Sequence, residues 1–236
     1  MTNYFPLVAS SIASIFMTLL LYKYSTTKKI HHLIWTAAIF MVFFTSLLEF
    51  FSELDGWTVA SYKVYYVMTA PLVALMGLGT LYLLRHKNWS KLFLVYTLVV
   101  SAVFVVAGAS ATVDEGAFTA PQDGTGSPSG SQIGGAAMPS YVRAMSPLLT
   151  VPGGLILILG AFYSFWLDRK RRYNLLIALG GVLYMAAGMS ARLGVTGLFY
   201  AVQTASLVLL FLGFLLGMEH GAKVELPGAD AQKTDA

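Results

Sequence analysis

Seven apolar runs, each roughly 20 residues long, alternate with polar connections along the chain, and a helix that crosses a bilayer needs about that length. The predicted spans cover residues 4–22, 33–52, 61–84, 91–110, 145–167, 174–193 and 197–218. Charged residues make up only 11% of the 236 residues, against about 25% in a typical soluble domain. The sequence therefore predicts an all-α polytopic bundle of seven transmembrane helices, with the lipid bilayer as its solvent.

The basic residues of the connections predict the direction of insertion. Lys and Arg gather in the first, third and fifth connections and in the tail, whereas the second and fourth connections are acidic. These bases are Lys23, Lys28, Lys29, Arg85, Lys87, Arg169, Lys170, Arg171, Arg172, Lys223 and Lys233. Basic connections stay in the cytoplasm. Seven spans then place the N-terminus outside and the C-terminus in the cytoplasm, as expected for a multi-pass protein of the cell membrane.

Composition also limits the function classes. The net charge is +4, but the bases form short clusters between apolar runs, so nucleic-acid binding is not expected. The chain has no cysteine, which excludes disulfides, iron–sulfur clusters and thiolate metal sites. The four histidines lie at predicted cytoplasmic helix ends and the seventh span has no lysine. Haem, another metal or a retinal Schiff base is therefore not expected, and we predict no cofactor. No Lys or Arg precedes the first run, which we expect to be a span and not a cleaved signal peptide.

Two segments outside the spans are long enough to describe separately. Residues 111–142 are rich in Gly, Ser and Pro and include the stretch PQDGTGSPSGSQIGG. This composition buries too little apolar surface to offset the entropy of ordering, so we expect a flexible external loop. Residues 219–236 form a short polar tail, which we expect to be cytoplasmic and too small for an output domain.

The chain shows signs of an internal repeat. A shift of 143 residues places Lys28-Lys29 on Arg171-Arg172 and Glu49 on Arg192. A shift of 134 residues places Gly79 on Gly213. These matches keep their order and their place in the helices, which favours a 3+1+3 arrangement of two parallel halves joined by the fourth span. Repeats of this kind are known among membrane transporters.

Ionisable residues gather at the predicted outer ends of the helices. A charged side chain near mid-helix costs roughly 2.5–3.5 kcal/mol, so each calls for a partner or a function. Glu49 lies furthest inside its span, and Glu53 is four residues on, on the same helix face. The candidate cluster is Glu49, Glu53, Lys63, Tyr66, Arg143, Arg192, Tyr200 and Gln203. We expect Glu49 to approach Arg192, Arg143 or Lys63.

Two interpretations of this cluster remain open. In the first, ion pairs join the helix ends at the membrane interface and the tyrosines belong to the aromatic belt. In the second, the cluster lines a ligand-binding vestibule that opens outward. Catalysis by Glu49 and Glu53 is not expected, because adjacent bases would keep both carboxyl groups ionised. The chain is therefore not predicted to be an enzyme.

Residues 28–84 read KKIHHLIWTAAIFMVFFTSLLEFF and then, after a short turn, YKVYYVMTAPLVALMGLGTLYLL. The pattern is a basic turn, an early Trp35, a late Glu49, and Tyr65-Tyr66 opening the next span. It resembles the seven-helix membrane sensor region of bacterial histidine kinases, and also small uncharacterised seven-helix membrane proteins of bacteria and archaea. The resemblance implies a sensor-like or accessory ligand-binding module. Without an output domain of its own, such a module would act through a separate membrane or signalling protein.

Two other functions fit the same sequence. One is a small-solute transporter of three-one-three helix plan, similar to sugar transporters of the SWEET type. The Pro-Gln signature of those transporters occurs here only at Pro121-Gln122, in the external connection. The other is a structural subunit of a larger membrane complex, for which smooth apolar helices are sufficient.

Overall fold

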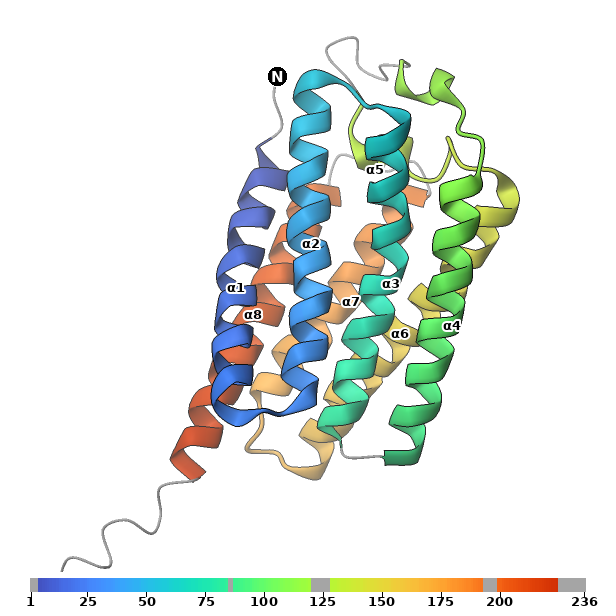
Figure 1. Ribbon diagram of the computed structural model, residues 1–236. Coiled ribbons are helices and arrows are strands. Elements are labelled where there is room, and N and C mark those ends of the chain that lie inside the picture. Colours follow the sequence, from blue (N-terminus) through green and yellow to red (C-terminus); the bar gives the residue numbers. More distant parts are fainter. Residues whose placement is uncertain (1–3, 85–86, 120–127, 193–198, 225–236) are drawn as a thin grey trace, which may run out of the picture.

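The computed structural model describes residues 4–84, 87–119, 128–192 and 199–224. All secondary-structure elements in these ranges are helices (Figure 1). The seven long helices are α1 (Phe5–Thr27), α2 (Ile30–Asp55), α3 (Val59–Leu83), α4 (Lys87–Ser110), α6 (Ser140–Leu167), α7 (Tyr173–Arg192) and α8 (Phe199–Val224). Two one-turn helices, η1 (Glu115–Phe118) and α5 (Gly130–Ile133), lie between α4 and α6. Seven helices are long and apolar enough to cross a membrane. The predicted all-α, seven-span fold is confirmed.

Each predicted span overlaps one long helix, and several helices extend past the predicted ends. At the end of α1, for example, the hydroxyls of Ser25, Thr26 and Thr27 donate to carbonyl oxygens one turn earlier, so these polar side chains find their hydrogen-bond partners within the helix. Polar residues therefore continue the helix beyond its apolar segment. Hydropathy alone does not detect such extensions.

Six of the long helices form a closed ring, and the seventh lies outside it. Around the ring, α1 contacts α2, α2 contacts α3, α3 contacts α6, α6 contacts α7, α7 contacts α8, and α8 returns to α1. Helix α4 packs on the outside, against α3 and α6. Figure 1 shows α4 at the edge of the bundle, where much of its surface is left for lipid.

The two ends of the bundle differ in charge. Helix α1 begins and α8 ends at opposite ends of the bundle (Figure 1). We name as the acidic end the one where α2 ends and α3 begins, with Glu53, Asp55 and Glu115. We name as the basic end the one with the α1–α2 and α6–α7 turns, where Lys29 and Lys170 lie. That the acidic end faces outward remains a prediction from these charges.

Helices α3 and α6 cross with their backbones in close contact. A Cβ atom built on Gly77 would lie 2.4 Å from the carbonyl oxygen of Gly153, and one built on Gly153 would lie 2.6 Å from Cα of Ala74. Small residues of this kind permit close helix packing in membranes. The crossing fixes α3, the most buried of the spans, against α6.

The substitution Gly77→Ala should therefore lower the free energy of unfolding by about 1–3 kcal/mol, because overpacking against backbone atoms cannot be relieved by a rotamer change. The measurement is the thermal unfolding midpoint in detergent. Gly188→Ala in α7 is the matched control, since no heavy atom lies within 4 Å of its built Cβ. That control should be neutral or slightly stabilising, as alanine favours helix over glycine. Equal midpoints for the two variants would contradict the close crossing.

The arrangement of the ring supports the predicted repeat, which stays a prediction. A two-fold axis that exchanged the two halves would exchange the α3–α6 contact with the α8–α1 contact, and both contacts are present. The two aligned glycines also face equivalent helices. Gly79 of α3 packs on Trp35 of α2, and Gly213 of α8 packs on Ile177 of α7.

The connection between α4 and α6 differs from the flexible loop expected for residues 111–142. Residues 128–138, which we call the cap segment, pack onto the acidic end of the bundle and contribute Ile133, Ala137 and Met138 to an apolar cluster with Tyr62 of α3. The backbone N–H of Asp114 donates to the carbonyl of Ala137, which ties the two parts of the connection together. Residues 120–127, the middle of the predicted loop, lie outside the described residues.

Candidate functional site

Glu49 lies in the interior of the bundle near the acidic end. Its side chain is only 2% exposed. Thr45, Ser52 and Glu49 share the buried face of α2, at helical spacing. Glu53 follows one turn later and is half-buried, so the two carboxyl groups lie on one face as the sequence predicts. Two adjacent carboxyl groups with so little solvent need hydrogen-bond donors.

One donor is shared by both carboxyl groups. The hydroxyl of Tyr200, at the start of α8, lies 2.7 Å from Oε1 of Glu49 and 3.0 Å from Oε1 of Glu53. A phenol carries a single proton, so it donates to one carboxylate at a time. Two full-strength hydrogen bonds at this oxygen therefore need a proton on one of the carboxyl groups, which then donates to the phenol oxygen. This arrangement ties α2 to α8 through a site that can hold a proton.

Further donors come from the cap segment. The backbone N–H groups of Gly130 and Ser131 donate to Glu49, and the hydroxyl of Ser129 hydrogen-bonds Tyr200. A capping box between Ser129 and Gln132 holds this turn in shape, because each side chain bonds the other residue's backbone N–H. The cap segment thus covers the carboxyl group of Glu49 and supplies hydrogen bonds to it and to Tyr200.

Two aromatic side chains anchor the cap segment to the bundle. The indole N–H of Trp57 donates to the carbonyl of Pro128 over 2.8 Å, and the hydroxyl of Tyr62 donates to the carbonyl of Gly134 over 2.8 Å. Both rings are buried. The cap segment is therefore held at three points: by Trp57, by Tyr62 and by the carboxyl of Glu49.

Gly130 lies where no side chain fits. A Cβ atom built on it would lie 2.4 Å from Oε1 of Glu49, 2.8 Å from Cζ of Tyr65 and 2.9 Å from the Tyr65 hydroxyl oxygen. Only a residue without a side chain lets the backbone approach the carboxyl closely enough for its N–H to donate. The glycine is required here for space, because its φ angle is not in the left-handed region.

Of the three bases that were expected beside Glu49, Lys63 and Arg143 lie elsewhere, and the structure does not describe the side chain of Arg192. Nζ of Lys63 donates to the carbonyl of Ala109 in α4, 2.8 Å away. Arg143 is exposed, with its side chain against Gly135. The side chain of Arg192 lies outside the described residues. Where side chains are described, neither carboxyl group forms an ion pair.

The two remaining candidates lie near the cluster but do not bond the carboxyl groups through any contact seen in the described residues. Tyr66 packs against Phe104, with its hydroxyl near Gly135. Gln203, one turn beyond Tyr200 along α8, hydrogen-bonds the hydroxyl of Tyr184 in α7. Among the predicted residues whose side chains are described, the structure brings three into direct hydrogen bonding with one another: Glu49, Glu53 and Tyr200.

The sequence prediction missed the contribution of the cap segment. Ser129 and Gln132 are spaced as a capping box, which is a recognisable signal for a helix start. That signal predicts a short ordered turn, but it does not tell which part of the bundle the turn contacts.

The carboxyl and hydroxyl groups of the site limit the kinds of ligand that it could bind. In the part of the chain that the structure describes, no three His, Cys, Asp or Glu side chains gather in a way that could hold a metal ion. The site is instead a pair of carboxyl groups with three surrounding hydroxyls, from Tyr65, Tyr200 and Ser129. Such a set can take up a proton, or accept hydrogen bonds from a small cation.

No family of proteins, no curated protein and no solved structure that was compared with this chain matches it. The geometry of the site therefore carries the functional argument.

Proposed function

We propose that this multi-pass membrane protein is a sensor-like or accessory binding module of the cell membrane. Its receiving site is the carboxyl pair of Glu49 and Glu53, at the end of the bundle that the basic connections predict to be outside. The module performs no catalysis and acts through a separate membrane or signalling protein.

The observation that carries this proposal is the double role of Glu49. Its carboxyl group accepts a hydrogen bond from Tyr200 and holds the cap segment through the N–H groups of Gly130 and Ser131. Hydrogen bonds to a charged acceptor are about twice as strong as neutral ones. A change of charge at Glu49 would therefore weaken or strengthen the hydrogen bonds that hold the cap segment. Protonation or ligand binding at the site would then change the position of the cap segment.

The charge of the site favours a cationic input. Two carboxyl groups lie together, and where side chains are described no base is paired with them. An anionic ligand would be repelled, whereas a proton or a small cation would be attracted. A proton is the smallest ligand that the site could bind. One added proton allows the Tyr200 hydroxyl to hydrogen-bond Glu49 and Glu53 at the same time.

A route for the output also follows from the chain order. The cap segment runs directly into α6, which begins at Ser140 and ends at the α6–α7 turn of the basic end. A displaced cap segment would act on the outer end of α6, and α6 is fixed to α3 at the Gly77–Gly153 crossing. The basic end is where a cytoplasmic partner would respond to the change.

Transport of a small solute is the second candidate. The closed ring of six helices, with the predicted two-fold repeat, favours it. The Gln203–Tyr184 pair places hydrogen-bonding groups one turn further into the bundle than Tyr200. Uptake of a labelled solute into proteoliposomes would support transport over sensing.

The sensor proposal is tested through the fluorescence of Trp57, which is buried under the cap segment. The contribution of Trp57 is obtained by subtracting the emission of the Trp57→Phe variant from that of the wild type. Titration with acid, sodium, calcium or an alkylammonium salt should shift this emission for at least one of them. The double variant Glu49→Gln, Glu53→Gln should lose the shift. A wild type that shows no shift with any of them, or a double variant that keeps it, would count against the proposal.

A further inference from the structure

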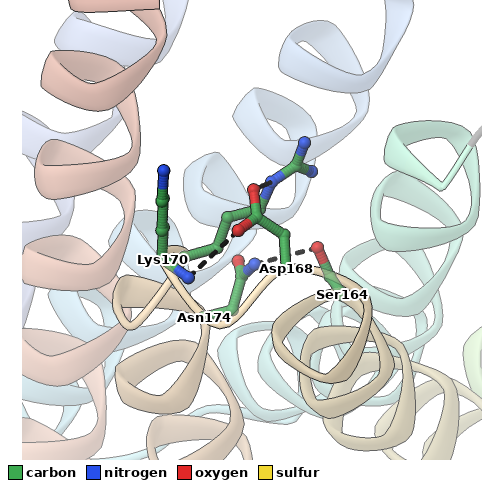
Figure 2. Close-up of polar contacts among 5 residues, drawn as sticks. Ser164, Asp168, Lys170 and Asn174 are labelled. Carbon is green, nitrogen blue, oxygen red and sulfur yellow. Dashed lines mark hydrogen bonds and ion pairs between the residues drawn. The ribbon is translucent and has the colours of Figure 1, made fainter.

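The α6–α7 turn at the basic end, residues 168–172, is ordered by its single acid. Asp168 accepts the backbone N–H of Lys170 over 3.0 Å and the side-chain Nε of Arg171 over 3.1 Å (Figure 2). Beneath the turn, the side-chain amide of Asn174 donates to the hydroxyl of Ser164 over 2.9 Å, and both residues are buried. These bonds hold the turn in one shape at the end of the bundle.

The turn carries four bases, of which Asp168 pairs with one. Arg171 forms the ion pair with Asp168. Arg169, Lys170 and Arg172 are exposed, and none of them has an ion pair with an acid in the part of the chain that the structure describes. Figure 2 shows the side chain of Lys170 extending away from Asp168. Three cations are thus presented within one turn.

An aromatic platform next to these cations sets their depth in the membrane. The guanidinium of Arg169 lies over the rings of Phe165 and Trp166, 4.9 Å and 4.7 Å from their centroids. Trp166 is 61% exposed, and its neighbour Leu167 is 65% exposed. Tryptophan favours the interface between the acyl chains and the headgroups. A bilayer that placed Trp166 at this interface would place the stacked Arg169 at the level of the lipid phosphates.

We propose that this turn is a binding site for an anionic phospholipid. Arg169, Lys170 and Arg172 bind its phosphate group, and the exposed faces of Trp166 and Leu167 contact the upper part of its acyl chains. Arginine suits this role because its planar group forms paired hydrogen bonds with phosphate oxygens. The proposal does not depend on the function assigned to the acidic end.

A bound membrane lipid explains more features of this turn than either of two alternatives: a bound soluble phosphate compound, or a role of the bases in orienting the chain in the membrane only. A soluble phosphate would leave Trp166 and Leu167 uncovered beside the bound anion. Orientation in the membrane needs only the positive charges. It needs neither the contacts that order the turn around Asp168 nor the stacking of Arg169 on two rings.

The test compares lipid binding by the purified full-length chain in detergent, measured by native mass spectrometry with added phosphatidylglycerol or phosphatidylcholine. The wild type should retain phosphatidylglycerol in preference. The variant Arg169→Gln, Arg172→Gln should bind it roughly thirty-fold more weakly, as expected for the loss of two interfacial bases. The matched control, Lys29→Gln with Lys91→Gln, removes two exposed bases from other helices of the same end and should keep the preference.

Each other outcome is also decisive. Equal binding of the two lipids, an unaffected double variant, or an equal loss in the control would overturn the site. Competition by glycerol 1-phosphate at the same concentration as the lipid would assign the turn to soluble phosphates and overturn the lipid proposal. If the double variant fails to fold, Arg169→Lys replaces it. That variant keeps the charge but loses the planar group, so it should bind phosphatidylglycerol several-fold more weakly, and wild-type binding by it would overturn the proposal.

Discussion

Replacing Gly130 by alanine should displace the cap segment from the carboxyl group of Glu49, which it covers. The added Cβ would lie 2.4 Å from Oε1 of Glu49 and within 3 Å of the Tyr65 ring and hydroxyl, and all of these atoms belong to buried or packed side chains. The backbone must then move outward. That movement breaks the N–H bonds from Gly130 and Ser131 to Glu49 and strains the bond between Trp57 and Pro128.

The expected loss in the free energy of unfolding is about 2–4 kcal/mol, from overpacking and from the loss of hydrogen bonds to a buried acceptor. The thermal midpoint in detergent should fall, and the emission of Trp57 should shift to longer wavelength as water reaches the ring. Gly116→Ala is the control in the same connection, since the atom nearest to its built Cβ is an exposed carboxylate oxygen of Asp114 at 3.1 Å. If Gly130→Ala behaved like Gly116→Ala, the cap segment would not be seated as described.

The fold could be predicted from the sequence because its signals are strong and local. Each span is a run of apolar residues long enough to cross a bilayer, and the described helices follow those runs. The closed ring, with α4 outside it, was not predictable in this way. Apolar residues that face lipid and apolar residues that face another helix look alike in a sequence.

The site was predicted in part. Glu49, Glu53 and Tyr200 could be named because buried charges are costly and because all three lie at the same predicted end of the bundle. The partner of Glu49 was expected to be a base, whereas its described partners are a phenol and two backbone N–H groups. Pairing residues by charge cannot find backbone donors, which every residue except proline carries.

Composition does not predict that residues 128–138 pack onto the bundle. Glycine and serine are typical of flexible chains. Here Gly130 permits a close approach to Glu49, and Ser129 caps a turn. The same small residues serve tight packing when the neighbouring helices supply donors and acceptors, as Trp57 and Tyr62 do.

Replacing Glu49 by glutamine should release the cap segment with little change in side-chain shape. Glu49→Gln keeps one oxygen acceptor but replaces the other oxygen with an NH₂ donor, so it offers fewer acceptors to Gly130, Ser131 and Tyr200 and can no longer gain or lose a proton. If the free energy that keeps the cap segment in place falls by about 1.4 kcal/mol, the fraction of molecules with a displaced cap segment becomes ten-fold larger. Tyr200→Phe should act in the same direction, because it removes the donor shared by the two carboxyl groups.

The control for this effect is Glu115→Gln. Glu115 lies in the same connection and the substitution changes the charge by the same amount, but its side chain is exposed. It should leave the cap segment in place. A double-mutant cycle between Glu49→Gln and Tyr200→Phe should show a coupling energy of about 0.5–3 kcal/mol, as expected for residues in one hydrogen-bond network.

The accessibility of the cap segment from outside the cell tests the central claim most directly. The chain contains no cysteine, so a single one can be placed at Ser131, which is 3% exposed, or at the exposed Ala136. With an impermeant thiol reagent added to intact cells, Ala136→Cys should react rapidly, and Ser131→Cys should react about ten-fold or more slowly. Adding Glu49→Gln should bring Ser131→Cys close to the rate of Ala136→Cys, whereas adding Glu115→Gln should not. Equal rates at the two positions in the otherwise unchanged chain, or reaction of Ala136→Cys only after permeabilisation, would contradict an outward-facing site closed by the cap segment.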